Sequence, residues 1–279
     1  ADGIDDHRQI TNEIRLSNST PGRMNYTVGI YSFEEDLDVL SLNFDTLAGG
    51  AENGRATQTQ NTSALAVFGN VSYDVTDQLT LAGGLRYSDD NKDFTASRSF
   101  APFVGPAGAL GPINVSVGDG QLSWDASATY AVNDDVNVYA RAARGFRSPS
   151  IQGRILFGDV VTTADSETLD SYEVGVKSFL LDRRLKANVT GYFYDIKDQQ
   201  LTAIGGAGNF NQLLNADEGR GYGFEADVSA RHISFLETGR SRPSADMIVH
   251  LSEVLDIPMD ARNQMMHATG FASRYAARP

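Results

Sequence analysis

Apolar and polar side chains alternate along residues 167–198, and this alternation is the clearest pattern in the chain. A period of two places apolar side chains on one face of a β-strand and polar ones on the other. The link at 181–183 is too short for anything but a tight reversal, so the segment predicts an antiparallel hairpin. Strands of about ten residues suit a tilted crossing of a bilayer.

The same alternation recurs along the chain and predicts nine strands, at residues 10–16, 24–33, 65–75, 79–88, 122–132, 136–142, 172–176, 185–194 and 222–228. Short connections at 18–22, 76–77, 133–135 and 181–183 alternate with long ones at 34–61, 89–121, 145–167 and 197–219, in a regular short–long rhythm. Within the long ones, residues 39–44 and 91–97 could add short strand segments. Outer-membrane barrels have short turns at one rim and long loops at the other. A soluble sandwich or propeller also has alternating strands, but it does not predict this rhythm.

Several tyrosines fall near predicted strand ends: Tyr73, Tyr87, Tyr130, Tyr192 and Tyr194. An aromatic girdle at the membrane–water interface places tyrosines there, although aromatic residues also favour ordinary sheet surfaces. The expected fold is therefore mainly β, consisting of antiparallel β-hairpins of an incomplete transmembrane β-barrel with a short α-helical C-terminal segment.

The composition narrows the function. The chain has no cysteine, so disulfides and thiolate metal sites are excluded, and no run of about 18 apolar residues indicates a transmembrane helix. The net charge of -13 argues against a general nucleic-acid binder. His7 is the only histidine before residue 231, and no Gly-rich phosphate loop or HExxH motif occurs, so we expect no enzyme. Neither a metal site nor a cofactor is predicted, because the acidic runs at 34–36 and 89–90 are better explained as solvated loop charges.

The composition changes near residue 230. Residues 1–230 carry 17 Lys and Arg against 31 Asp and Glu, whereas residues 231–279 carry 6 against 5. Such a break suggests two segments of different origin. The first residues, ADGIDDHRQ, contain no secretory signal, so a chain of the outer membrane is expected to be truncated at its front.

Several stretches resemble the barrel of TonB-dependent outer-membrane receptors, from about Gln9 to Val228. They are residues 61–94, 136–154 with the motif Arg-Gly-Phe-Arg-Ser-Pro at 144–149, 167–200 and 215–227. The resemblance implies active uptake of an iron–siderophore, cobalamin or a similarly scarce ligand across the outer membrane, with the TonB system and outer-membrane lipid as partners. Such barrels have about 22 strands and a plugged lumen.

This sequence departs from the family pattern in two ways. Nine predicted strands make less than half a barrel, and neither the amino-terminal plug nor the short box that engages TonB is found. We therefore expect that the chain does not transport on its own. The family places ligand contacts on the plug and outer loops, so only two weak ligand-binding candidates remain, Arg147 and Arg154 in a long loop. Solvated loop or lumen charges are the plainer explanation of both.

Residues 229–279 resemble the later part of a Cro-type (XRE) helix-turn-helix regulator. Ser229 is a suitable N-cap, Gly239 ends a first helix, Ser244 caps a second and Pro258 opens a third. In that family, residues matching Ala230, Arg231 and Ser234 would point into the DNA major groove. The two preceding helices are missing, and a charge of +1 gives a weak grip on phosphates.

The expected domains are therefore a partial barrel at 1–228 and a truncated helix-turn-helix-like tail at 229–279. Two coding fragments joined across Phe224–Ala230 would produce such a chimera, because that stretch suits both families. The alternative function is a DNA-binding transcriptional regulator that works through the tail. The three tail histidines lack metal-ligand spacing.

Overall fold

The computed structural model describes residues 2–18, 22–45, 47, 49–102, 108–181, 183, 185–205, 210–230, 248–249, 252, 257 and 259–268. Almost all of them are in strands. The strands are β1 (Asp2–Ser17), β2 (Met24–Asp45), β3 (Ala51–Asp74), β4 (Leu79–Phe100), β5 (Leu110–Asn133), β6 (Val136–Arg147), β7 (Ser150–Gln152), β8 (Thr162–Ala164), β9 (Glu167–Leu180), β10 (Leu185–Gly205) and β11 (Phe210–Ala230).

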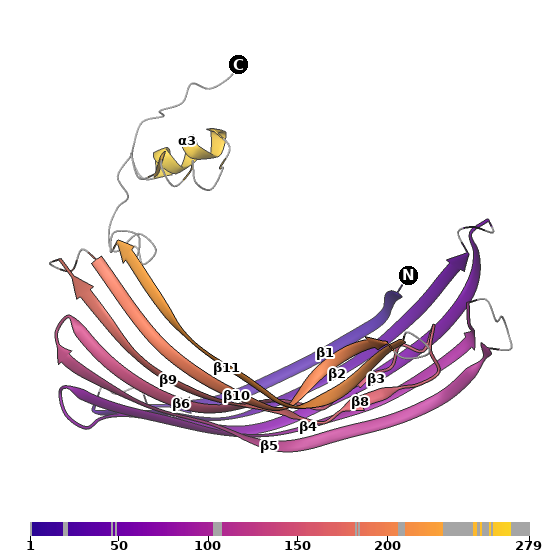
Figure 1. The fold of residues 1–279 in the computed structure, drawn as a ribbon, viewed down its shortest axis with the longest axis horizontal. Coiled ribbons are helices and arrows are strands. Elements are labelled where there is room, and N and C mark those ends of the chain that lie inside the picture. The colour runs from indigo at the N-terminus through magenta and orange to yellow at the C-terminus, as the bar shows by residue number, and fades with distance from the viewer. Residues whose placement is uncertain are drawn as a thin grey trace. The chain divides into compact units, whose positions relative to one another are not determined.

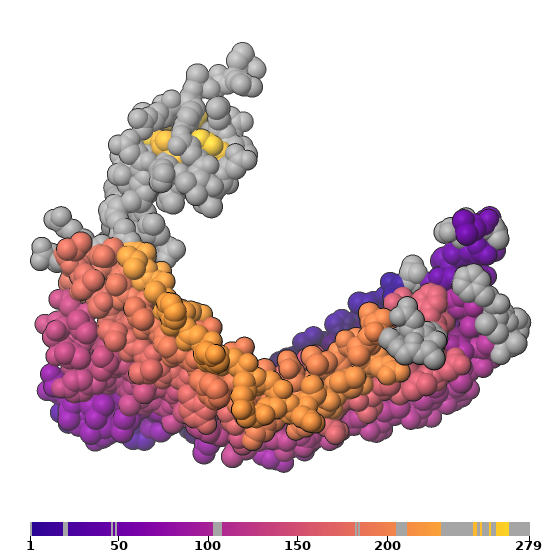
Figure 2. All heavy atoms as spheres, in the orientation of Figure 1, coloured from indigo at the N-terminus to yellow at the C-terminus, as the bar shows by residue number. Residues whose placement is uncertain are grey.

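Nine of these strands form one sheet in the order β1-β2-β3-β4-β5-β6-β9-β10-β11, and β7 and β8 form a separate two-stranded sheet (Figure 1). Each strand of the large sheet therefore lies beside its neighbour in the chain, apart from the small β7–β8 hairpin. In the space-filling view the strands pack in contact and the colour changes step by step across the sheet (Figure 2). The mainly β, antiparallel fold expected from the alternation is confirmed. Within the described residues, β1 and β11 are the two edges of an open sheet.

The predicted short turns are present where the structure describes them. β3 and β4 pair from Asp74↔Thr80 outward, and the Val75 amide donates to the Leu79 carbonyl at 2.8 Å. β5 and β6 close at Asn133↔Val136. Because a tight turn fixes the register of its hairpin, these contacts determine which side chains share a face.

The strands are much longer than the sequence predicted. β2 and β3 pair from Met24↔Tyr73 to Asp45↔Ala51 with one shift of register, at Asn43/Phe44. β4 and β5 pair as far as Arg98↔Leu110, with a shift at Ala96/Arg98. The expected long connections at 34–61, 89–121 and 197–219 are therefore mostly strand, so their assignment as loops was wrong. The reason is that the outer side chains there are polar too, at Thr57, Thr59, Asn61 and Ser63, so no apolar stripe marks the strand. Only the short segments allowed at 39–44 and 91–97 agree with the structure, as parts of β2 and β4. Paired backbone groups still satisfy one another.

The sheet has an apolar face and a polar face over its turn-proximal half. Cross-strand partners share a face, so one row of the apolar face runs Ile14, Ile30, Val67, Tyr87 and Leu122, and the next runs Leu16, Val28, Gly69, Leu85 and Trp124. Many of these side chains are exposed, among them Leu85 at 60% and Val67 at 57%. A large exposed apolar surface of this kind is not covered by protein within the described residues.

Three of the five tyrosines predicted near strand ends lie on the apolar face: Tyr73, Tyr87 and Tyr130 are all exposed there. Tyr192 and Tyr194 do not. Their rings stack on each other at 6.3 Å and lie over Gly223 and Gly221 on β11, on the face opposite to the exposed Val189 and Phe193. The parity of β10 therefore assigns them to the polar face.

The chain divides into two compact units, Ala1–Val176 with Thr190–Glu225, and Lys177–Val189 with Ala226–Pro279. The second unit contains the turn end of the β9–β10 hairpin, where the Ser178 hydroxyl donates to the Ala187 carbonyl at 2.8 Å. It also contains α3 (Met259–Ala268), which agrees with the third helix predicted in the tail. Among the described residues, no helix has the length and apolar character needed to cross a membrane.

Candidate functional site

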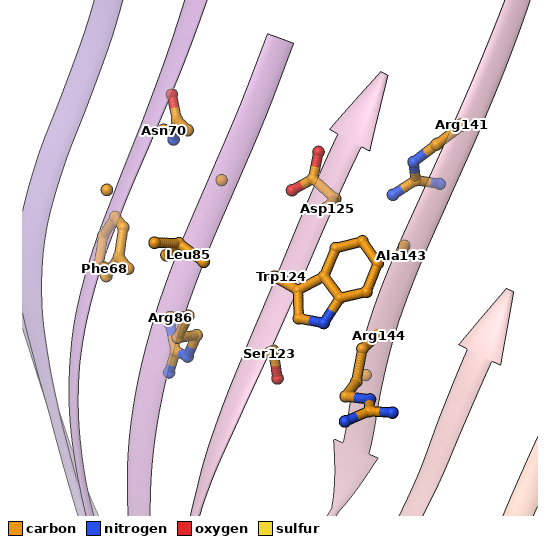
Figure 3. Close-up of a pocket in the computed structure, with 13 residues that line it drawn as sticks. Phe68, Asn70, Leu85, Arg86, Ser123, Trp124, Asp125, Arg141, Ala143 and Arg144 are labelled. Atoms are coloured by element: carbon orange, nitrogen blue, oxygen red, sulfur yellow. The ribbon is translucent and has the colours of Figure 1, made fainter. Parts of the chain in front are cut away.

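Two neighbouring hollows bring most of the candidate chemistry together. The first, of about 360 Å³, opens on the polar face, and we call it the arginine site: it is lined by Tyr31, Phe33, Ala64, Ala66, Arg86, Ser88, Asp90, Phe146 and Ser148. The second has the same volume and shares Arg86 with the first (Figure 3). Its polar lining comes from β3, β4, β5 and β6, with Asn70, Ser123, Asp125, Arg141 and Arg144. The strand register therefore collects residues that are far apart in the sequence.

Arg86 is the central group of the arginine site. Its guanidinium carbon lies 5.2 Å from the ring centroid of Tyr31 and 5.6 Å from that of Phe68. Its Nε donates to the Ser88 hydroxyl at 3.0 Å. A cation held between two aromatic faces is fixed in position while its remaining N–H groups stay available. In the described part of the chain Arg86 forms no salt bridge with a carboxylate, although its charge favours the ionised form of Asp90, which lines the same site.

Lys92 and Asp90 lie on the same face of β4, further along the strand than Arg86. The Lys92 ammonium donates to the Ser148 hydroxyl at 3.0 Å and to the Pro149 carbonyl at 2.5 Å. Burial lowers the pKa of Lys92, and the nearby Asp90 carboxylate partly opposes that shift by raising it. Burial likewise raises the pKa of Asp90, and Lys92 partly opposes that shift. Each group therefore favours the charged form of the other in a half-buried setting.

The two arginines predicted as ligand contacts have different surroundings. Arg147 is exposed, and its charge contributes to the lowered pKa of Lys92, but it does not line the arginine site, whereas its neighbours Phe146 and Ser148 do. Arg154 pairs with Asp2 at 3.0 Å and lies 5.6 Å from the Phe157 ring centroid. Arg154 is therefore already engaged, and a ligand role for either residue stays a prediction.

The residues proposed to contact DNA are largely outside the described part of the chain. Ala230 is the last residue of β11 and is strand rather than helix. Arg231 and Ser234 lie outside the described residues. The Phe224–Ala230 stretch, which suited both a strand and a turn into a helix, belongs to β11.

Sequence reasoning missed Arg86, Lys92, Tyr31 and Phe68 as a group. Parity alone places each of them on the polar face of its strand, and this signal was present. What parity cannot give is the register, which puts Phe68 directly opposite Arg86 and places Tyr31 in the adjacent row. The cluster therefore becomes visible only when three strands are aligned.

A sheet of consecutive antiparallel hairpins, apolar on one face and polar on the other, defines the wall of a transmembrane β-barrel. The comparison with protein families agrees with this class. The chain belongs to the family described as TonB dependent receptor-like, beta-barrel, whose model matches residues 2–253. The match continues past residue 228, where a second family was expected to begin, and only the receptor part of that expectation is supported.

Sequence comparison with individual proteins also finds receptors. The chain is 27% identical over 175 residues to the pesticin receptor of Yersinia pestis, covering 60% of this chain and 23% of that protein. It is 29% identical over 140 residues to the rhizobactin receptor of Rhizobium meliloti strain 1021, covering 43% and 18%. The chain thus spans less than a quarter of the length of these curated relatives.

Solved structures share the fold. The ferric yersiniabactin uptake receptor FyuA from Yersinia pestis superposes with a TM-score of 0.66 at 19% identity, covering 81% of this chain and 33% of that one. The copper transporter OprC superposes with a TM-score of 0.62 at 16% identity, covering 80% and 35%. At these identities the likeness supports the arrangement of strands and not a shared ligand.

Proposed function

We propose that this chain is part of the barrel wall of an outer-membrane receptor that takes up a scarce ligand such as an iron–siderophore. The observation that carries the proposal is the two-faced sheet: the apolar face is exposed and continuous over five strands, while the opposite face carries arginines, aspartates and tyrosines. Lipid would cover the first face and a water-filled lumen the second. Relatives described as pesticin and rhizobactin receptors support this assignment.

The arginine site gives the polar face its proposed role. A guanidinium held between two rings, with an ammonium further along the same strand, suits an anionic ligand that also carries flat or aromatic groups. We propose that the arginine site, together with Arg147, contributes to the ligand path of the intact receptor.

We also propose that uptake belongs to a longer assembly and not to this chain alone. β1 and β11 each present one unpaired edge within the described residues. In lipid every unpaired N–H or C=O group costs several kcal/mol, so an open sheet is not a stable pore. The TonB system would act on the plug of the intact receptor.

The single tryptophan of the chain tests whether the apolar face meets hydrocarbon. Trp124 lies directly opposite Leu85 on that face. In phospholipid vesicles, brominated acyl chains should quench its fluorescence strongly and aqueous iodide only weakly. The control is the Trp124→Phe, Tyr139→Trp double variant, whose reporter moves to the polar face, where the Tyr139 hydroxyl contacts Thr190. That reporter should respond to iodide instead. Iodide quenching of Trp124 in a soluble, lipid-free chain would overturn the proposal.

The claim that this chain does not transport alone has its own test. The chain, equipped with a secretion signal, is expressed in a strain that lacks its siderophore receptors, and outer-membrane fractions are probed to show that it is present. We expect no uptake of radioactive iron from ferric siderophores, whereas the intact ferric yersiniabactin uptake receptor FyuA serves as the positive control with its own ligand. Restored uptake would refute the claim.

The expected tail, residues 229–279, begins with the last two residues of β11 and contains α3, and we propose that the part after β11 is of a different origin from the barrel. The regulator function expected from its sequence resemblance is measured by titrating operator-library DNA at several salt concentrations. Because the tail carries a charge near zero, we expect only weak, salt-sensitive binding. Sequence-specific binding at nanomolar protein would favour the regulator.

A further inference from the structure

The segment that joins β6 to β9, residues 148–166, lies against the polar face, and we call it the strap. Sequence reasoning predicted an outer loop here. Instead it contains the β7–β8 hairpin, paired from Ser150↔Ala164 to Gln152↔Thr162. The strap begins at Ser148, which lines the arginine site. Its placement therefore bears on what the site can admit.

Apolar side chains dock the middle of the strap. Ile155 and Leu156 are both fully buried, at 0% exposure, in a cluster with Ala56, Phe94 and Ala96 of β3 and β4. A methyl group added at Gly153 would lie 1.9 Å from the Phe94 ring, so the backbone of the strap sits directly on that ring. Adjacent, fully buried aliphatic residues are not expected in a solvated loop.

Arg98 of β4 holds the strap on one side. Its side chain is 5% exposed, and it donates to the carbonyls of Ile155 at 2.7 Å and Gly158 at 2.9 Å and to the Asp159 carboxylate at 2.5 Å. A buried guanidinium is tolerated only when its N–H groups are paired in this way. The strap therefore satisfies Arg98, and Arg98 fixes the strap.

Gln200 of β10 holds the strap on the other side. Its amide nitrogen donates to the carbonyls of Ser148 and Asp165, both at 2.9 Å, and its carbonyl accepts from the Ser150 hydroxyl at 2.8 Å. Asn215 of β11 adds a further donation to the Asp165 carbonyl at 3.0 Å. Both ends of the strap are thus tied to strands that lie three or more places from β4 in the sheet.

We propose that the strap is docked across the polar face in the resting protein, ties β4 to β10, and fixes Ser148 as a wall of the arginine site. Lys92 supports this arrangement, because its ammonium donates to the Ser148 hydroxyl and the Pro149 carbonyl, and Ser148 lines the site. The strap is therefore docked in the absence of ligand, and it limits the size of the ligands that can reach Arg86.

Trypsin provides a test that needs no ligand. The Arg154–Ile155 bond joins an exposed arginine to a fully buried isoleucine, so cleavage requires the strap to leave the sheet. In the full chain folded in detergent we expect cleavage there at least 100-fold slower than in a synthetic peptide of residues 148–166. Cleavage at Arg23–Met24, in a turn remote from the strap, reports on the rest of the fold.

Two variants remove one anchor each. Arg98→Met keeps the aliphatic stem but loses the donors, and Gln200→Leu loses the amide; both should accelerate cleavage at Arg154–Ile155 at least tenfold and leave Arg23–Met24 unchanged. Arg55→Met is the matched control, because Arg55 pairs with Glu52 and not with the strap. Cleavage of the parent chain at the peptide's rate would overturn the proposal, and so would anchor variants that cleave no faster than Arg55→Met. Neither result depends on uptake or on the ligand.

Discussion

A charge placed on the apolar face of β3 should be far more costly than the same charge on its polar face. Val71 and Asn70 are adjacent and lie at the same depth, but Val71 is opposite Gly83 on the apolar face and Asn70 is opposite Gly84 on the polar face. We therefore compare Val71→Arg with Asn70→Arg. Because the two variants add the same side chain to the same strand at the same depth, a difference in their stability reports the environment of the two faces.

The expected size follows from the position of Val71. The apolar residues of β3 run from Leu65 to Tyr73, so Val71 is two residues from their centre at Gly69. An arginine facing lipid near the mid-plane costs about 2 to 4 kcal/mol, and less toward the interface. At 1.36 kcal/mol per tenfold change, this is about a 30- to 900-fold shift of the folding equilibrium. Asn70→Arg should change it by less than about threefold, because a lumen-facing charge stays hydrated.

Urea titration in phospholipid vesicles measures both variants, with Trp124 emission as the signal because that residue is two strands away from the change. We expect the midpoint to fall for Val71→Arg and to stay near that of the parent for Asn70→Arg. Equal losses for the two variants would refute the assignment of faces. Tolerance of both would mean that neither face meets lipid.

Two further predictions concern packing and protonation. A methyl group at Gly221 would lie 2.2 Å from the Tyr194 ring, so Gly221→Ala should destabilise the sheet by about 1 to 3 kcal/mol in the urea assay, whereas Gly145→Ala, with open space around it, should not. Adding Tyr194→Ala to Gly221→Ala should recover part of the loss, and no recovery would contradict the contact. Burial lowers the pKa of Lys92, so the unfolded chain binds more protons between that lowered pKa and the ordinary 10.5. The free energy of unfolding should therefore rise with pH across that window in the parent but not in Lys92→Met; parallel pH profiles would contradict the shift.

The half of each strand next to the short turns was predictable from the sequence. There the two faces differ in polarity, so Leu79 to Tyr87 and Leu65 to Val75 carry a period-two signal that few other structures produce. Short turns then fixed the order of the hairpins. Nine strands were expected, and nine make up the large sheet in the described residues.

The strap and the arginine site were not predictable, because both depend on contacts between distant parts of the chain. Arg98 and Gln200 fell within segments assigned to loops, and nothing local indicates that they bind the same segment. Ile155 and Leu156 belong to a short apolar run at 155–157, which has neither the period of a strand nor the length of a helix. Their partners, Phe94 and Ala96, lie on an extension of β4 that the sequence indicated only weakly, because Phe94 is the only large apolar residue at 91–97.

Along β4 the apolar side chains change from one face of the sheet to the other, and this change explains why the strap is needed. On β4 the apolar face carries Leu81, Leu85 and Tyr87, but the next residues on that face are Asp89, Asn91 and Asp93. Beyond Lys92 the opposite face becomes apolar instead, with Phe94 and Ala96. The pairing of β3 with β4 runs through this level with no shift of register, so no bulge accounts for the change.

Where a barrel strand extends beyond the bilayer, water covers its outer face, and apolar side chains there no longer stabilise the sheet. The extended part of the strands still requires buried apolar side chains, and these can lie only on the face that is polar in the turn-proximal half. Phe94 and Ala96 begin such a face, and Ile155 and Leu156 of the strap cover it. If the apolar face meets lipid as proposed, the solvent of the outer face changes from hydrocarbon to water at the level between Tyr87 and Phe94. The strap is the element that lets the strands continue past it as a folded structure.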